Sequence, residues 1–310
     1  MLGSLYLPIA GNGVNIFLLL GLGGAVGFLS GLFGVGGGFL MTPLLIMAGI
    51  PSTVAAASDS NQIVAASASG SYAHWRMGNV DLKMGLFLLL GGVAGGTLGV
   101  QLIKVLRALG NADFVIKITY VVMLGVIGSY MFVESLQSLR GKVAHPTRRT
   151  EAARPSLYAR MVQALPWPMR FEKSGVTLSA LMPLILGGFV GILAAIMGVG
   201  GGFIMVPVMV YLLRMPMHVV VGTSLFQILF TCINVTVMQA VTNHTVDLIL
   251  ALILLLGSTL GAQFGARLSR RLKADQLKIL LASIVLLVMV QILVGLILPP
   301  HLRLDYKGGH

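Results

Sequence analysis

Two glycine-rich stretches carry the residue types best suited to hold a small anion. Gly34–Phe39 reads Gly-Val-Gly-Gly-Gly-Phe, the same six residues recur as Gly198–Phe203, and Pro43 and Pro207 follow at equal spacing. Each stretch interrupts an apolar segment and precedes a run that is too short to cross a bilayer as a helix. We therefore expect each stretch to begin a short helix near the middle of a membrane, reached from opposite sides.

Helix starts of this kind can bind anions through the backbone. An N-terminus presents free N–H groups and about half a positive charge, and glycine lets a ligand approach the main chain closely. The alternative is that the glycines serve close packing between membrane helices. Their duplication favours the anion site. The predicted substrate-binding glycines are Gly36, Gly37, Gly38, Gly200, Gly201 and Gly202.

Polar side chains at helical spacing follow each glycine stretch, and Gln62 and Gln227 align when the two regions are overlaid. Neutral hydroxyls and amides can hydrogen-bond an oxyanion and release it again, which a paired arginine would resist. Alternatively, such groups hydrogen-bond neighbouring helices, at about 1 kcal/mol each. The predicted substrate-binding residues of these polar stripes are Ser58, Asn61, Gln62, Thr223, Ser224, Gln227 and Asn234.

Asp59 is the only acid well inside an apolar segment. Ionisable groups at such positions are candidates for function, so Asp59 could carry a proton that accompanies the anion. An equal alternative is that it pairs with a helix N-terminal dipole. Asp81 and Asp247 stand where long apolar runs begin, and we expect them to be helix N-caps. Phe39 and Phe203, which follow the glycines, are candidate gates.

No catalytic pattern accompanies these residues. The sequence lacks GxSxG, HExxH and a P-loop lysine. Its single cysteine, Cys232, excludes an internal disulfide and a cysteine-based metal cluster. We therefore expect neither an enzyme nor a bound metal or cofactor.

The composition makes lipid the solvent for most of the surface. Hydrophobic residues are 56% and charged residues 10% of the 310, and the mean hydropathy is +0.94, whereas a soluble domain has about 25% charged residues. The net charge of +12 lies in loops beside apolar runs, which is typical of membrane topology rather than nucleic-acid binding. We predict an all-α integral membrane protein. The apolar segments are Asn15–Phe33, Gly38–Ile50, Val54–Ala73, Leu82–Ile103, Phe114–Val133, Leu178–Met197, Gly202–Leu213, Val219–Val241, Leu248–Ala266 and Ile279–Pro299.

The chain contains the same unit twice. Besides the glycine stretches, Val80–Leu82 is matched by Val246–Leu248, and Thr97–Gln101 by Thr259–Gln263, in the same order. An odd number of segments per copy turns the second copy upside down. We predict two inverted repeats of about five segments, each with a glycine-rich broken or re-entrant helix. The first spans residues 1–136 and the second 177–300, with a linker at 137–176 and a short tail at 301–310.

The linker fixes the expected orientation. Residues 137–175 contain eight Lys and Arg against two Glu, so the positive-inside rule places them in the cytoplasm. Both termini then lie on the non-cytoplasmic side. Within the linker, Arg154–Lys173 interleaves apolar and basic residues, as an amphipathic helix on an anionic leaflet does. A disordered tether is an equal alternative.

The paired Gly-Val-Gly-Gly-Gly-Phe stretches, each with its proline, resemble the sulfite exporter TauE/SafE family. The resemblance covers the repeated unit twice and the basic linker. It implies a bacterial inner-membrane exporter of sulfite, sulfoacetate or a related organosulfonate, driven by an ion gradient.

Together these patterns predict a secondary transporter that moves a small anion by alternating access, since inverted repeats give two related conformations around a central site. One alternative is a membrane scaffold that transports nothing and docks a partner through its basic linker. A passive anion channel is the other. The expected partners are the anion and the lipid bilayer, and no nucleic acid.

Overall fold

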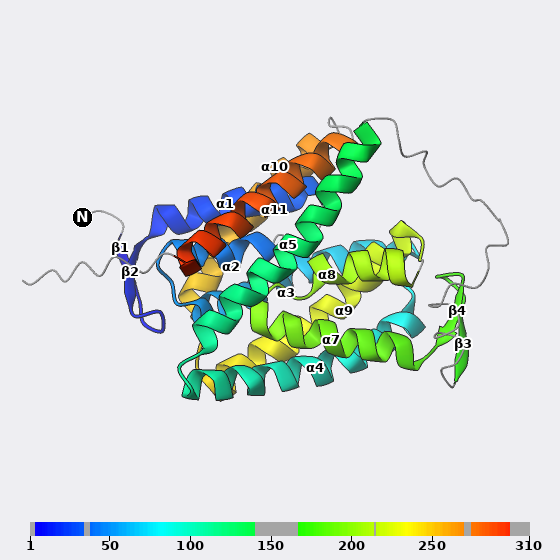
Figure 1. The fold of residues 1–310 in the computed structure, drawn as a ribbon, viewed down its shortest axis with the longest axis horizontal. Helices are drawn as coiled ribbons and strands as arrows, with labels where there is room; N and C mark the ends of the chain where they lie inside the picture. The colour runs from blue at the N-terminus through cyan, green and yellow to red at the C-terminus, as the bar shows by residue number, and fades with distance from the viewer. Residues whose placement is uncertain (1–3, 34–37, 140–166, 214, 270–273, 298–310) are drawn as a thin grey trace, which may run out of the picture.

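The structure is a computed structural model, and it describes residues 4–33, 38–139, 167–213, 215–269 and 274–297. Most of these residues are helical, and the long helices lie side by side (Figure 1). Four helices are long and apolar enough to cross a membrane: Leu82–Ala108, Ala112–Glu134, His218–Asn243 and Leu248–Gly265. The protein is therefore an α-helical membrane protein, as its composition predicts.

The elements follow the predicted apolar segments closely. The first half contains β1 (Ser4–Leu7), β2 (Asn12–Asn15), α1 (Ile16–Phe33), α2 (Gly38–Met47), α3 (Ser52–Arg76), α4 (Leu82–Ala108) and α5 (Ala112–Leu139). The second half contains β3 (Pro168–Phe171), β4 (Val176–Ser179), α7 (Leu181–Met197), α8 (Gly202–Pro207), η1 (Val208–Leu212), α9 (Met217–Met238), η2 (Gln239–Asn243), α10 (Leu248–Ser269) and α11 (Ala274–Ile297). The helices α2 and α8 that follow the glycine stretches are short, as expected; α8 continues directly into the π-helical turn η1.

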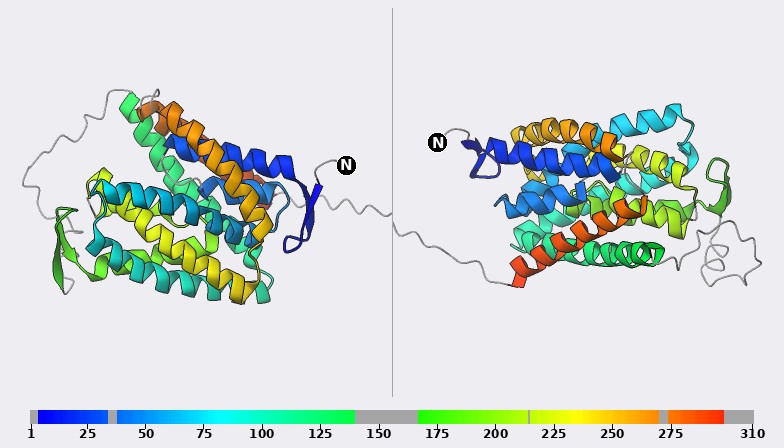
Figure 2. Two further views of the ribbon diagram at one scale, coloured as in Figure 1. Left: turned by 180° about the vertical axis from the view of Figure 1, so that it is seen from behind. Right: turned by 90° about the horizontal axis from the view of Figure 1, so that it is seen from above.

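Helices of the two halves pair with each other. The most extensive contacts join α1 to α10 and α4 to α7, and further pairs are α3 with α9 and α5 with α11 (Figures 1 and 2). Glycines line the two closest pairs. A Cβ added to Gly95 of α4 would lie 2.0 Å from the carbonyl oxygen of Gly188 in α7, and one added to Gly261 of α10 would lie 2.0 Å from that of Gly24 in α1. These helices touch backbone to backbone, as small residues permit in membranes.

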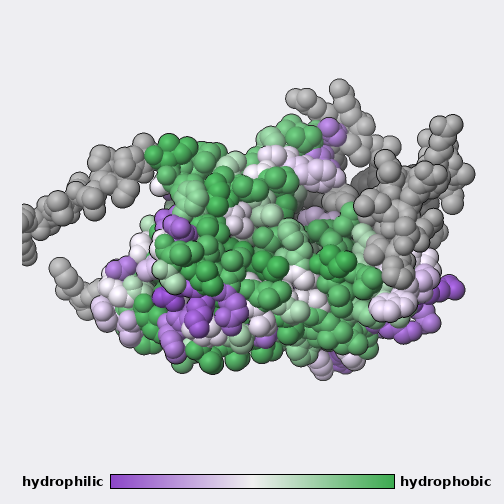
Figure 3. All heavy atoms as spheres, turned by 60° about the horizontal axis from the view of Figure 1, so that its bottom comes forward, coloured by the Kyte–Doolittle hydropathy of each residue, from purple (hydrophilic) through white to green (hydrophobic). Residues whose placement is uncertain are grey.

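Large apolar side chains cover the outside. Hydrophobic residues spread over much of the face shown in Figure 3. Such a surface would be unfavourable in water but suits lipid. Exposed large apolar residues include Leu86, Leu90 and Leu98 of α4 and Leu256, Leu260 and Phe264 of α10.

Two short β-hairpins lie at opposite ends of the long axis, β1–β2 at the left and β3–β4 at the right of Figure 1. Their registers are equivalent: Leu7 pairs with Asn12 in one hairpin, and Phe171 pairs with Val176 in the other. The sequence analysis did not anticipate either hairpin. Because Pro168–Phe171 is a strand, the amphipathic helix predicted over 154–173 is wrong for these residues; its part at 154–166 lies outside the described residues.

Candidate functional site

The starts of the two short helices meet in the interior. The rings of Phe39 in α2 and Phe203 in α8 stack, with centroids 4.4 Å apart and planes inclined by 15°. A Cβ added to Gly38 would lie 3.4 Å from the Cα of Val199, between the two halves' glycine stretches. The ends of the two stretches therefore lie side by side, although they are 164 residues apart in sequence. Gly36 and Gly37 lie outside the described residues.

The second glycine stretch forms the turn between α7 and α8, and its conformation requires glycine. Gly198, Gly200 and Gly201 have φ angles of 74°, 69° and 78°. Gly198 ends α7, with its N–H donating to the carbonyl of Ala194 at 2.8 Å, and Gly201 is the N-cap of α8. Glycine adopts the left-handed region about as readily as the right-handed one, whereas other residues are strained there. We call residues 198–201 the glycine turn.

Protein atoms approach this turn closely from several helices. An added Cβ would lie 2.1 Å from the carbonyl oxygen of Ala56 at Gly198, 2.7 Å from the sulfur of Cys232 at Gly200, and 2.4 Å from Val190 Cγ1 at Gly201. Close packing between helices, the alternative to an anion site, therefore explains why these three positions have no side chain. Gly202 and Phe203, as the first residues of α8, have no intrahelical acceptor for their N–H groups.

The polar stripe of α9 faces α4. Thr223 Oγ1 accepts a hydrogen bond from the Asp81 N–H at 3.0 Å, and Asn234 Nδ2 donates to Thr97 Oγ1 at 3.1 Å. Gln227 Nε2 donates to Thr231 Oγ1 at 2.9 Å within α9. Much of this stripe therefore hydrogen-bonds a neighbouring helix, which is the alternative to substrate binding given in the sequence analysis. Ser224 is buried, and its hydroxyl bonds the Val221 carbonyl at 3.1 Å.

The stripe of α3 is arranged in an equivalent way. Ser58 Oγ accepts a hydrogen bond from the Asp247 N–H at 3.3 Å, as Thr223 does from Asp81. Asn61 is half-buried, and Gln62 is buried.

The two equivalent glutamines differ from their neighbours. Gln62 and Gln227 each have a buried side-chain oxygen without a hydrogen-bond partner among the described residues. Leaving such a group unpaired costs about 1–3 kcal/mol. Turning the Gln227 amide over would keep its bond with the Thr231 hydroxyl, which can donate or accept, and would present the NH₂ group to a ligand instead. Among the predicted residues of the two stripes, these two amides have hydrogen-bonding capacity that the described residues leave unused.

Asp59 lies about two turns into α3, which begins at Ser52. The effect of a helix dipole fades within the first turn, so the interpretation of Asp59 as a helix-start partner is wrong. Its side chain is fully buried, and its Oδ2 accepts a hydrogen bond from Thr42 Oγ1 of α2 at 2.8 Å. Its Oδ1 has no partner among the described residues.

Asp81 and Asp247 are helix N-caps, which confirms their prediction. Asp81 Oδ1 accepts from the Met84 N–H and Asp247 Oδ1 from the Leu250 N–H, both at 3.1 Å. Each second oxygen binds a hairpin turn: Asp81 Oδ2 accepts from Ser174 N at 3.0 Å and Ser174 Oγ at 2.6 Å, and Asp247 Oδ2 accepts from Ile9 N at 3.2 Å. Each aspartate therefore joins a helix start in its own half to a hairpin in the other half.

The sequence matches a known family over most of its length. The family model described as "Sulfite exporter TauE/SafE" matches residues 19–292, which include both glycine stretches and both caps. The chain belongs to the sulfite exporter TauE/SafE family. The resemblance carried by the paired glycine stretches is confirmed, and the protein is a multi-pass membrane transporter.

Curated relatives are consistent with this membership of the TauE/SafE family. The chain is similar to the "Probable membrane transporter protein YjnA" of Bacillus subtilis, with 26% identity over 67% of this chain and 72% of the relative. It is similar to YunE of the same organism, with 24% identity over 74% and 80% of the two chains. A "Probable membrane transporter protein" of Xylella fastidiosa is 29% identical over 69% and 70%. No solved structure matches the chain.

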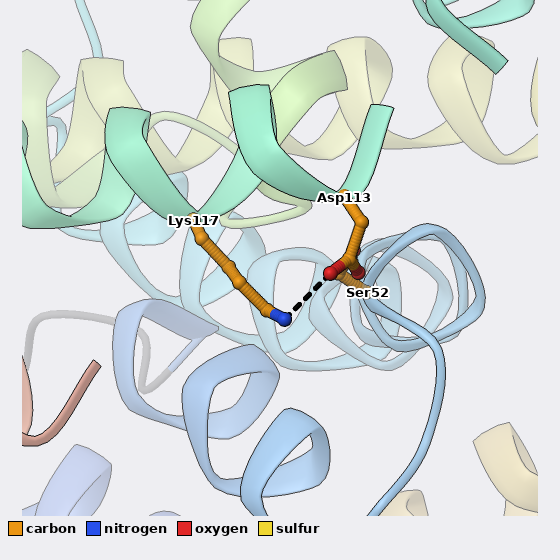
Figure 4. A network of polar contacts seen from close by, with 3 residues as sticks. All are labelled: Ser52, Asp113 and Lys117. Carbon is orange, nitrogen blue, oxygen red and sulfur yellow. Dashed lines mark hydrogen bonds and ion pairs between the residues drawn. The ribbon is translucent and has the colours of Figure 1, made fainter. Parts of the chain in front are cut away.

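A further polar cluster joins the starts of α3 and α5. At the start of α5, Asp113 accepts a hydrogen bond from the Ser52 hydroxyl and pairs with Lys117 at 2.5 Å (Figure 4). The side chains of Lys117 and Asp113 are 26% and 54% exposed, so the pair contributes about 0–1 kcal/mol to stability. Among the described residues, no group of His, Cys, Asp and Glu is arranged to hold a metal ion.

Proposed function

We propose that this protein exports a small anion, sulfite, sulfoacetate or a related organosulfonate, by alternating access coupled to an ion gradient. Membership of the TauE/SafE family supports the substrate class. The observation that carries the proposal is the meeting of the α2 and α8 starts, because it brings one broken helix from each half to a common point. Transporters bind substrates at such discontinuities near the membrane midplane.

In this proposal the halves are inverted repeats related by an axis in the membrane plane. The exchanged pairs α1–α10 and α4–α7 support this relation, as do the equivalent bonds of Ser58 with Asp247 and Thr223 with Asp81. Each repeat then begins with its hairpin, since β1–β2 and β3–β4 share one register. The protein lies in a bacterial inner membrane, with the 137–176 linker in the cytoplasm and both termini on the other side.

The anion binds where the two helix starts converge. The N–H groups of Gly36–Gly38 and Gly200–Gly202 supply the positive field, and Gln62 and Gln227 supply neutral hydrogen bonds. Asn61, Ser224 and the remaining predicted members of the stripes lie on the same two helices, and Thr231 accepts the hydrogen bond of Gln227. Because Cys232 and Ile63 pack against Gly200, α3 and α9 must separate from the glycine turn to admit the anion.

Flux into liposomes tests this function. Purified protein is reconstituted, the vesicles are loaded with sulfite, sulfoacetate, sulfate or chloride, and efflux is followed under imposed ion gradients. We expect saturable efflux of a sulfur oxyanion that responds to a gradient and exceeds chloride efflux. Absence of any flux would favour the membrane scaffold, and deletion of the basic linker should then remove all function. Conductance that no ion gradient changes would favour the passive channel.

Phe39 and Phe203 form the proposed gate, since their stacked rings lie over the point where the halves meet. A stacked aromatic pair stabilises the closed gate by about 0.5–1.5 kcal/mol beyond the effect of its buried area. Replacing both with alanine is therefore expected to raise downhill anion efflux several-fold and to weaken its response to an imposed gradient. Phe189→Ala on the exposed side of α7 is the matched control. Unchanged efflux in the double variant would exclude the gate.

A further inference from the structure

Asp59 presents a buried carboxylate without a balancing charge. Its side chain is fully buried, one oxygen accepts from Thr42, and the other has no hydrogen-bond partner among the described residues. The titratable groups that face it are Tyr120 from α5 and Cys232 from α9, and neither is a cation. The ion pair between Lys117 and Asp113, in the described part of the chain, does not include Asp59. Burying an unpaired ionised carboxylate costs several kcal/mol, so this side chain requires a proton or a cation.

A chain of hydroxyl groups leads from Asp59 to the glycine turn. Thr42 Oγ1 donates to Asp59 Oδ2, the buried Tyr120 hydroxyl lies near Thr42, and the same hydroxyl donates to the carbonyl of Met197. Met197 is the last residue of α7. The hydroxyl of Ser60, the residue after Asp59, lies 3.1 Å from the carbonyl oxygen of Ala56 in its own helix and 3.3 Å from that of Gly198. Hydroxyl groups beside the carboxylate thus reach Met197, at the end of α7, and the next residue of α3 reaches Gly198.

This inference rests on the proposed function: we propose that the coupling ion is a proton carried by Asp59, and that the hydroxyls of Thr42 and Tyr120 accommodate its arrival and departure beside the glycine turn. When Asp59 is ionised, the Thr42 hydroxyl donates to Oδ2. When a proton binds Oδ2, the acid donates to Thr42, whose own hydrogen turns to the Tyr120 oxygen, and Tyr120 donates to Met197. Both states satisfy every hydroxyl hydrogen by rotation of the Thr42 hydroxyl alone. They differ by one proton, and the neutral state leaves no charge in the membrane interior.

The second half offers no equivalent acid. With Gln62 aligned to Gln227, Ser224 occupies the position of Asp59, and its hydroxyl bonds the Val221 carbonyl of its own helix. The proton site is therefore present once per chain, whereas the broken helices are present twice. This asymmetry predicts one proton for each anion carried.

The test uses the reconstituted full-length protein and compares anion efflux with and without an imposed pH gradient. Asp59→Asn resembles the neutral acid in shape, so we expect anion exchange to continue at a reduced rate while stimulation by the pH gradient is lost. Asp59→Glu should retain stimulation, with a shifted pH profile. Tyr120→Phe should weaken it severalfold. Asp113→Asn, an acid-to-amide change at an exposed position, should behave as wild type.

The outcomes separate this inference from the function on which it rests. If wild-type protein moves no anion, both fail. If it moves anions and Asp59→Asn still responds to the pH gradient, the proton site is excluded while the transport function stands. A wild-type response to a sodium gradient, with none to pH, would overturn the inference in favour of sodium. Size-exclusion profiles of the variants show that each remains folded.

Discussion

Replacing Gly198 with alanine is expected to abolish anion transport and to destabilise the fold by about 2–5 kcal/mol. The residue has a φ angle of 74°, where a side chain costs roughly 1–2 kcal/mol. The added Cβ would also lie 2.1 Å from the carbonyl oxygen of Ala56 and 2.4 Å from its Cα. Because these are backbone atoms of α3, relief requires a helix to shift, and overpacking of this kind typically costs about 1–3 kcal/mol more.

Thermal unfolding in detergent and efflux from liposomes measure this effect, and the chain supplies graded controls. Gly21→Ala in α1 meets nothing within 4 Å and should leave stability equal or slightly higher. Gly201→Ala should be intermediate, since the nearest atom is a side-chain methyl of Val190 at 2.4 Å, which can move. If the Gly198→Ala protein unfolds at the wild-type temperature and releases anion at the wild-type rate, the glycine turn is not constrained as described.

Local sequence patterns predicted the helices well because hydrophobicity is a local property here. Every apolar segment expected in the described residues contains a helix, and the aspartate caps followed from their place where long apolar runs begin. The two hairpins escaped because four-residue strands carry little pattern, and an isolated hairpin is barely stable in water. Their one signal was the equivalence of Gly11 and Gly175, both at a positive φ.

The candidate site was harder to predict because a stripe of polar residues does not reveal what it faces. Thr223 and Asn234 lie at helical spacing as expected, but their partners on α4 are more than 100 residues away in sequence. The same holds for Gly200, whose neighbour is Cys232 of another helix. Residue type indicates hydrogen-bonding capacity, whereas only the tertiary arrangement decides whether a helix or a ligand uses it.

Removing one aspartate cap is expected to loosen one end of the protein and leave the other intact. Asp81→Ala removes the cap of α4, worth about 1 kcal/mol, and leaves the buried N–H and hydroxyl of Ser174 without an acceptor, at about 1–3 kcal/mol. Asp247→Ala removes the cap of α10 and its bond to Ile9 at the opposite end (Figure 1). Each of the two substitutions removes a contact between the halves at one end of the protein. Under alternating access, Asp81→Ala and Asp247→Ala should therefore favour conformations that open at opposite ends.

Cysteine accessibility can distinguish these shifts, because the natural Cys232 is buried and can be replaced by serine as a background. Ser58 and Thr223 are both fully buried and mark the Asp247 and Asp81 ends. In the Asp247→Ala protein, maleimide labelling should rise for Ser58→Cys and stay low for Thr223→Cys; in Asp81→Ala the pattern should reverse. Asp113→Ala should change neither. Equal labelling at both ends in either variant would mean that the caps stabilise the fold without controlling access, since a protein that opens one side at a time must keep the other closed.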